Sequence, residues 1–484
     1  MRIFQIFFIL ALSTIIACQA EKCCQGSRSF FVPRSVTHNS TYELALTNYH
    51  IFAEENCSNA YFFAAPFYQQ TSKASDFARY FLYHNQESVT FSDSGLADVN
   101  SLWFNVISAP GTFYNSTVSI RPTRKVAGGY FYGWFNFGQL LDCDRWNLSN
   151  MWLSVNFAAF QAKHNLNVCE TPSAAPGTIP GFASITQALN NPEWRAGRWN
   201  RCSMHRSGVD DIQIKLGYTL YPSECVNHVA FYLVGTIPTG NIPSNLFLFE
   251  PYVGTRFGAL GVGLNGSIDW DICNQDLTFM FDVKYRHLFQ GKNCRSFDLC
   301  ANGDWSRYLQ VVTSEQPFFS QPGINAFTLP INVDPGNELQ VWAAVHGCWC
   351  SLNWELGYNL WWRQEEDLNF RGCNFPPVGI YDITGSCNLN PISASQATIS
   401  QGPVPPNQAP SDAVFTPVVI NNLNRKSASA PSVLTNTLYG AIEYGACICD
   451  YETDLGLLGS YEFGQDCKGA PSQWSIMVKL GLGF

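Results

Sequence analysis

The last eleven residues of the chain, WSIMVKLGLGF (474–484), alternate strictly between two kinds of side chain. Every second residue counted back from Phe484 is apolar, and the residues between them are small or polar. Because side chains on a β-strand point to opposite sides in turn, this segment predicts a strand with one apolar face and one polar face.

The same alternation recurs along the chain in segments of about ten residues. The clearest examples are residues 211–220, 260–270, 277–286 and 352–360. Further candidate strands are residues 128–138, 151–161, 229–237, 339–349, 438–449 and 455–465. A tilted strand needs about ten residues to cross a bilayer, whereas strands of soluble proteins average about five or six. The segments therefore predict an antiparallel transmembrane β-barrel.

The connections between these strands fall into two sets. If the last strand runs toward the periplasm, the short connections lie on the periplasmic side, at residues 139–150, 221–228, 271–276, 350–351 and 450–454. The long connections then lie outside, at residues 162–210, 238–256, 290–338 and 369–436, with residues 466–473 as a shorter member. Short periplasmic turns and long external loops are typical of outer-membrane barrels.

The strand count predicts a barrel of about twelve strands, with ten or fourteen as alternatives. The segments above give eleven strands, and single-chain bacterial barrels have an even number. The missing strand is expected at residues 101–106 or 59–67. We therefore predict an all-β barrel over residues 101–484, preceded by an N-terminal segment, residues 21–100, that holds a first strand or a partial plug. Residues 391–431, rich in Pro, Ser, Ala, Gln and Asn, are expected to form a mobile surface loop.

The N-terminus predicts export. Met1 and Arg2 precede an apolar run over residues 3–16 and small residues up to Ala20, which is the pattern of a signal peptide covering residues 1–20. An alternative is a lipoprotein cleavage box, in which Cys18 becomes the lipidated first residue. Either form of export, combined with a barrel, predicts localisation in the bacterial outer membrane.

Composition agrees with a membrane barrel. Charged residues make up 13% of the chain and aromatic residues 15%. After the leader, no stretch approaches the roughly 18 continuous apolar residues of a membrane helix. The net charge of −9 and the lack of a basic cluster argue against a nucleic-acid partner.

Several short motifs carry a resemblance to a known family. They are FFVPRS (30–35), DIQIKLGY (211–218), LFEPYVG (248–254), CRSFDLC (294–300) and SRYL (306–309). Together they resemble a large paralogous family of uncharacterised, cysteine-containing outer-membrane proteins of host-associated bacteria of the Dependentiae type. The final strand is likewise similar to the strand that closes bacterial outer-membrane barrels, where Phe484 would act as the assembly signal. The resemblance implies a fold and a location but no activity.

The chain has 18 cysteines, and removal of the leader would leave an odd number. In an oxidising compartment we expect disulfides, together with a free thiol or a bridge between chains. Cys294 with Cys300, and Cys373 with Cys387, are candidates for bridges within external loops, although connectivity cannot be deduced from sequence. No metal site or other cofactor is expected, because C-x-x-C pairs and histidines at ligand spacing are lacking.

Catalytic motifs are also lacking, since the chain has no GxSxG, HExxH or P-loop sequence. His287 lies at the outer end of its strand, but its phase puts it on the lipid-facing side. We therefore expect no enzymatic activity and no catalytic residue.

Charged and polar residues in the polar phase of the strands are predicted to face the lumen, because a lipid-facing Lys or Arg at the midplane costs about 2–4 kcal/mol. The candidates are Gln213, Lys215, Asp282, Lys284, Arg286, His346, Glu355, Glu443, Glu462 and Lys479.

Two functions fit these charges: a porin-like channel for small hydrophilic solutes, or a structural or surface-interaction protein that is crosslinked through disulfides and does not conduct. Occlusion of the lumen would discriminate between them. In both cases the expected partners are outer-membrane lipid, the barrel-assembly machinery and a disulfide-linked or non-covalent oligomer.

Overall fold

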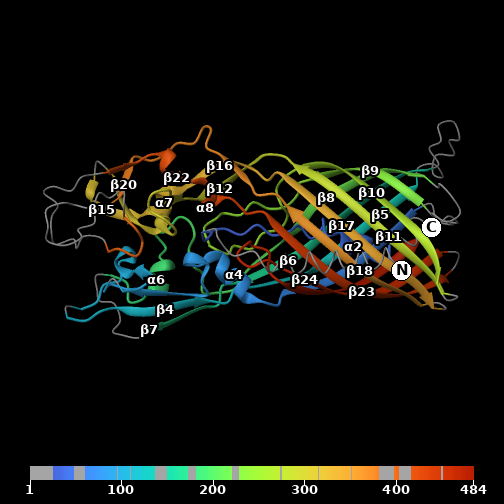
Figure 1. Cartoon of the computed structure of the whole chain (residues 1–484), viewed down its shortest axis with the longest axis horizontal. Helices are drawn as coiled ribbons and strands as arrows, with labels where there is room; N and C mark the ends of the chain where they lie inside the picture. The colour runs from blue at the N-terminus through green and yellow to red at the C-terminus, as the bar shows by residue number, and fades with distance from the viewer. Residues whose placement is uncertain are drawn as a thin grey trace.

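The computed structural model describes most of the chain outside its first 25 residues. The described ranges are 26–47, 60–94, 96–109, 111–136, 150–172, 181–220, 228–272, 275–313, 316–349, 352–380, 397–402, 416–448 and 451–483. The predicted signal peptide with Cys18, Cys387 and the C-terminal Phe484 lie outside these ranges. Figure 1 shows a barrel of long tilted strands, with many shorter elements gathered at one end of it. No described helix is both long enough and apolar enough to span a membrane.

Twelve antiparallel strands close the barrel, in the order β1, β25, β24, β23, β18, β17, β11, β10, β9, β8, β6 and β5. Their bounds are β1 Ala60–Thr71, β5 Thr123–Asn136, β6 Met151–Asn165, β8 Met204–Leu220, β9 His228–Ile237, β10 Ala259–Ile272, β11 Gln275–Leu288, β17 Asn337–Trp349, β18 Leu352–Arg363, β23 Val433–Ile448, β24 Tyr451–Phe463 and β25 Gln473–Gly483. The C-terminal strand pairs with β24 on one side and with β1 on the other. The predicted all-β barrel of about twelve strands is confirmed.

The barrel is apolar outside and polar inside. For example, Leu260 on β10 is 58% exposed and Leu480 on β25 is 55% exposed. Lys479, which directly precedes Leu480 on β25, is buried. A soluble protein would bury the leucines and expose the lysine, because apolar surface is driven out of water. The reversed pattern is the one that a lipid-facing wall requires.

The twelfth strand lies at one of its two predicted positions. β1 begins at Ala60 and covers most of the predicted segment 59–67. The alternative, residues 101–106, is wrong as a strand, because Ser101–Phe104 form the 3-10 helix η2. The Asn100 side chain accepts a hydrogen bond from the Leu102 N–H at the start of η2, and Trp103 is fully buried.

The long connections fold together at one end of the barrel into a unit that we call the cap (Figure 1). Its strands are β2 Ser88–Ser92, β3 Val99–Asn100, β4 Asn115–Ile120, β7 Val168–Pro172, β12 Gly291–Ser296, β13 Asp298–Leu299, β14 Gln310–Thr313, β15 Gln316–Pro322, β16 Thr328–Asp334, β19 Asp367–Asn369, β20 Val378–Ile380, β21 Thr416–Val418 and β22 Leu423–Asn424. Its helices are α4 Ala74–Phe81, η1 Tyr83–Asn85, η2, α6 Ile185–Leu189, η5 Ser306–Tyr308, α7 Gly323–Phe327, η7 Ile420–Asn422 and α8 Arg425–Ala428.

The cap has its own apolar core. Trp103, Trp199, Phe249, Phe297 and Trp305, which come from four different connections, are all fully buried in it. Burial of each such side chain contributes about 1.5–3 kcal/mol. The described parts of the predicted long loops are therefore structured. The part of the predicted mobile loop that the structure describes at residues 416–431 packs here too, since Ala428 and Ala430 are buried.

The predicted bridge between Cys294 and Cys300 is wrong, because both thiols are unpaired. Cys294 lies in β12 opposite Pro330 of β16, whereas Cys300 follows β13 and donates its backbone N–H to Asn422. The two cysteines thus belong to different sheets. The Cys373 thiol donates to the Pro330 carbonyl oxygen at 3.0 Å, and its predicted partner lies outside the described residues. Cys467, between β24 and β25, is disulfide-bonded.

Candidate functional site

A stretch of chain that precedes the first strand runs from the cap into the lumen. This lumen segment, residues 26–47, begins in the cap, where the Arg28 Nε donates to the Ser429 carbonyl oxygen at 2.8 Å and Arg307 donates to the Ser27 carbonyl oxygen at 3.2 Å. Further along, it forms the helix α2, Ser40–Leu44, among the barrel strands (Figure 1). Every residue of α2 is buried, so the barrel wall surrounds this part of the segment.

Local hydrogen bonds define the single turn of α2. The Asn39 side chain accepts from the Thr41 N–H at 3.1 Å, as an N-cap residue does. The turn ends at Leu46, whose φ of 59° lies in the left-handed region. That conformation costs about 1–2 kcal/mol for a residue with a Cβ. Two wall residues offset the cost: Glu355 accepts from the Leu46 N–H at 3.0 Å, and the Lys479 Nζ donates to the Leu46 carbonyl oxygen at 2.5 Å.

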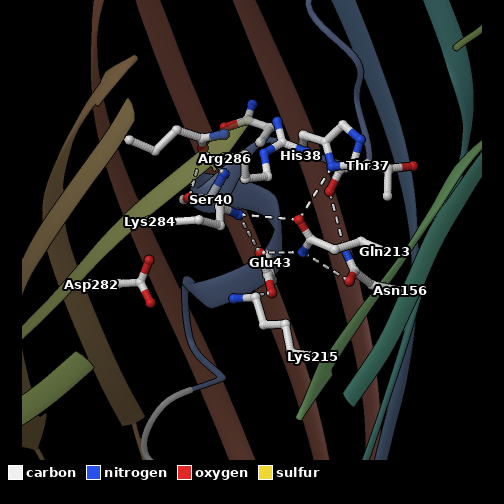
Figure 2. Close-up of polar contacts among 12 residues, drawn as sticks. Thr37, His38, Ser40, Glu43, Asn156, Gln213, Lys215, Asp282, Lys284 and Arg286 are labelled. Carbon is white, nitrogen blue, oxygen red and sulfur yellow. Dashed lines mark hydrogen bonds and ion pairs between the residues drawn. The ribbon is translucent and has the colours of Figure 1, made fainter. Parts of the chain in front are cut away.

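Glu43 on α2 is the centre of a buried charge cluster, which Figure 2 shows. Its carboxylate lies 2.5 Å from the Lys215 Nζ and 3.1 Å from the Lys284 Nζ, and it accepts from Gln213 at 3.1 Å. Asp282, also fully buried, supplies a second negative charge beside the two lysines. The cluster is thus electrically balanced only while Glu43 is in place.

The wall also holds the segment between the cap and α2. Asp210 accepts hydrogen bonds at 2.9 Å from the Ser35 hydroxyl and from the Thr37 N–H. On β17, four strands from β8 in the barrel, Gln340 accepts from the Ser40 hydroxyl at 2.7 Å. The segment is therefore hydrogen-bonded to more than one strand of the barrel, and Tyr42 adds apolar contacts to Phe67 and Tyr130.

The structure places all ten sequence-predicted lumen residues inside the barrel, where each is at most 6% exposed. Six of them contact the lumen segment directly: Gln213, Lys215, Lys284, Glu355, Glu462 and Lys479. These six side chains bind the lumen segment and are not exposed to solvent in this state.

The other four predicted residues bond to the wall or face one another across it. Arg286 forms an ion pair with Glu338, and Asp282 accepts from the Tyr232 hydroxyl at 2.7 Å. Glu443 accepts from Lys479 at 3.3 Å. His346 is buried opposite Glu355 in the register of β17 and β18.

Sequence reasoning missed the residues that close the lumen. Arg34, His38 and Glu43 lie in a short polar stretch without strand alternation, and a helix of five residues is too short to show helical periodicity. Their wall partners lack the signal of a mid-strand charge, because Gln340 is uncharged and Asp210 precedes the predicted strand 211–220, although β8 itself begins at Met204. The motif FFVPRS, residues 30–35, lies within the lumen segment and is the sequence feature that marks it.

Comparisons with known proteins show only distant structural likeness. No protein family model matches the chain. No curated protein matches it either. Among solved structures, a FadL homologue from Pseudomonas aeruginosa is similar over 94% of this chain and 99% of its own, at 8% identity and a TM-score of 0.31. The translocator domain of autotransporter NalP from Neisseria meningitidis is similar over 93% and 96%, at 7% identity and a TM-score of 0.27.

The NanC porin is similar over 69% of this chain and 94% of its own, at 10% identity and a TM-score of 0.24. Similarity at this level does not assign the fold, so the assignment rests on the strand pairing of this chain. A closed barrel of twelve antiparallel strands, apolar outside and polar inside, defines the chain as a β-barrel of the outer-membrane class.

Proposed function

We propose that this chain is exported to the bacterial outer membrane, where the barrel anchors the cap at the cell surface and the lumen segment closes the barrel. In this proposal outer-membrane lipid surrounds the apolar wall, the barrel-assembly machinery inserts it, and the cap is the part that meets the surroundings. The role is structural or surface-interacting, without free conduction.

One observation carries the proposal: the lumen segment is held at both of its described ends. At the cap end, Arg28 and Ser27 are bonded into the cap. At the other end, Leu46 is bonded to Glu355 and Lys479 on the wall. A segment held in this way cannot swing out of the barrel as a hinged lid would, because either the cap contacts or the wall contacts must break first.

The buried charges also favour a closed barrel. A diffusion pore needs hydrated charges along its path, whereas the charges around Glu43 are desolvated and paired. Breaking a buried ion pair by removing one partner costs about 3–5 kcal/mol. The closed state is therefore the expected resting state.

A second candidate function is a channel for small hydrophilic solutes that opens when the segment is displaced. The observation that favours it is the set of hydrogen bonds between segment and wall, as at Asp210 and Gln340. Water can replace hydrogen bonds of this kind, so displacement loses chiefly the apolar contacts, such as that of Tyr42 with Phe67. Opening by displacement would leave the barrel itself intact.

Planar-bilayer conductance of the refolded full chain separates these functions. We expect no steady current from the wild-type protein, and a steady current would overturn the closed-barrel proposal. The informative variant is Glu43→Gln, with the exposed cap residue changed in Glu193→Gln as its matched control. Brief openings in Glu43→Gln alone would favour the displaceable segment, whereas silence in all three would favour the anchor.

A further inference from the structure

Three arginines meet around a small cavity at the cap end of the lumen. Arg34 comes from the lumen segment, Arg124 from β5 and Arg363 from β18, and together with Trp361 and Glu462 they line a cavity of about 30 Å³. The Arg34 side chain is 8% exposed, and Arg124 and Arg363 are each 5% exposed. Three cationic side chains from three separate elements therefore share one nearly dry space.

Among the described residues, one carboxylate, that of Glu462, lies within ion-pair distance of these guanidinium groups. Arg363 contacts the Trp361 ring at 5.6 Å, but it has no carboxylate within ion-pair distance there, and its Nε makes no hydrogen bond. Arg124 donates to Gln69 at 2.9 Å, while its Nε also lacks a partner.

Arg34 forms a long ion pair with Glu462, the one carboxylate among the residues that line the cavity. Its terminal nitrogens lie 3.7 Å from Glu462 and 3.2 Å from Gln340, and its Nε makes no hydrogen bond. Glu462 is itself shared with Gln473, which donates to it at 2.7 Å. Among the residues that line the cavity, three are positively charged and one, Glu462, is negatively charged. Glu338, the cross-strand neighbour of Arg363, does not line the cavity and forms its ion pair with Arg286.

Burying a guanidinium without a partner is costly, so proteins pair such groups or bind an anion beside them. The planar fork of arginine matches the oxygen atoms of phosphate and carboxylate groups, and arginine is accordingly the usual residue at sites for these anions. A volume of 30 Å³ exceeds what a single water requires. We propose that the cavity binds one small oxyanion of the phosphate class, which accepts hydrogen bonds from Arg34, Arg124 and Arg363.

Such an anion would join the lumen segment to the wall, because Arg34 belongs to the segment and the other two arginines belong to strands. Binding would therefore stabilise the closed barrel. This consequence rests on the proposed closed lumen, but the binding itself does not. Binding is measured without conductance, so failure of the anion site and failure of the closed-barrel proposal are distinguishable.

The test is isothermal titration of the refolded full chain in detergent with sodium phosphate, at an ionic strength held constant with sodium chloride. We expect saturable binding of one phosphate per chain, with acetate weaker because it offers fewer oxygen atoms. Arg363→Gln should weaken phosphate binding at least ten-fold. The matched control Arg206→Gln changes an exposed arginine of β8 and should bind as the wild type does.

Thermal unfolding supplies a second readout that a purely structural arginine would not give. Without phosphate, Arg363→Gln should unfold at a higher temperature than the wild type, because it removes a buried charge that has no ion-pair partner among the described residues. With phosphate, only the wild type and Arg206→Gln should gain stability. Should Arg363→Gln fail to fold, Arg363→Lys keeps the charge but loses the fork, and its phosphate affinity should fall by a smaller factor.

Three results would overturn the site. The first is the absence of saturable phosphate binding to the wild type. The second is equal binding by Arg363→Gln, or by Arg363→Lys where that variant replaces it. The third is an equal stabilising effect of chloride and phosphate at matched ionic strength, which would reduce the effect to screening.

Discussion

Glu355 on β18 accepts a hydrogen bond at 3.0 Å from the backbone N–H of Leu46, 309 residues earlier in the chain. A carboxylate of the barrel wall thereby stabilises a left-handed residue of the lumen segment, and Lys479 bonds the carbonyl oxygen of the same residue. Charged side chains that face the lumen thus form hydrogen bonds with the backbone of the lumen segment. Their role in closure can be tested one contact at a time.

Removal of the Glu43 charge should release the lumen segment. In Glu43→Gln, Lys215 and Lys284 lose their shared carboxylate, and we expect a loss of about 3 kcal/mol in the free energy of unfolding, as for other broken buried pairs. Urea unfolding of the refolded protein measures it. The double variant Glu43→Gln with Lys284→Gln restores the charge balance and should recover part of the loss. Equal stability of wild type and Glu43→Gln would contradict the role of this cluster.

Charge reversal at Lys284 and Arg286 should damage folding more than it alters ion preference. Lys284 pairs with Glu43 and Arg286 pairs with Glu338, so the change of both to Glu places like charges together in a buried space. We expect a lower yield of folded barrel, measured by heat-modifiable electrophoresis. The matched control reverses Lys125 and Lys163, two exposed cross-strand neighbours, and should fold normally. A well-folded Lys284→Glu, Arg286→Glu protein with a cation-selective current would instead support a hydrated pore.

The cap should lose stability at low pH through Glu170. Burial raises the pKa of this carboxyl, but hydrogen bonds from the Thr186 hydroxyl, from Tyr114 and from two backbone N–H groups outweigh burial, and the pKa lies below its usual value of 4.5. A lowered folded-state pKa gives stability that is complete above the unfolded-state pKa and is lost as pH falls through the folded-state value.

Glu170→Gln should therefore destabilise the cap at pH 7 and flatten its acid dependence below about pH 4.5. Tryptophan fluorescence during unfolding at several pH values measures this, since Trp103, Trp199 and Trp305 lie in the cap core. Glu193→Gln, at an exposed site, is the control. An acid dependence identical in wild type and Glu170→Gln would exclude Glu170 as its source.

The barrel was predictable because its physical constraint acts on every second residue. Lipid on one face and a polar lumen on the other make Leu260 and Leu480 alternate with polar positions, and this pattern survives without any knowledge of contacts. The inward position of Lys215, Lys284 and Glu355 follows from the same alternation.

The cap and the closure of the lumen were not predictable in this way. The cap core gathers Trp103, Trp199 and Trp305 from separate connections, and no periodicity marks them. The lumen segment mixes polar and apolar residues without periodicity, so its buried Glu43 has the sequence appearance of a surface residue. Only the three-dimensional contacts reveal that the predicted lumen charges have partners supplied by the chain itself.

Crosslinks between chains should form through cap cysteines. Cys169, Cys202 and Cys300 are exposed and unpaired in the structure, and an exposed thiol in an oxidising compartment is available for exchange. Non-reducing electrophoresis should show oligomers that collapse on reduction, and changing all three residues to Ser should abolish them. Cys294→Ser, at a less exposed position of the cap, is the control and should leave the oligomers unchanged. The protein could instead stay monomeric, with these thiols free, after export to an oxidising envelope. That result would exclude disulfide crosslinking between caps.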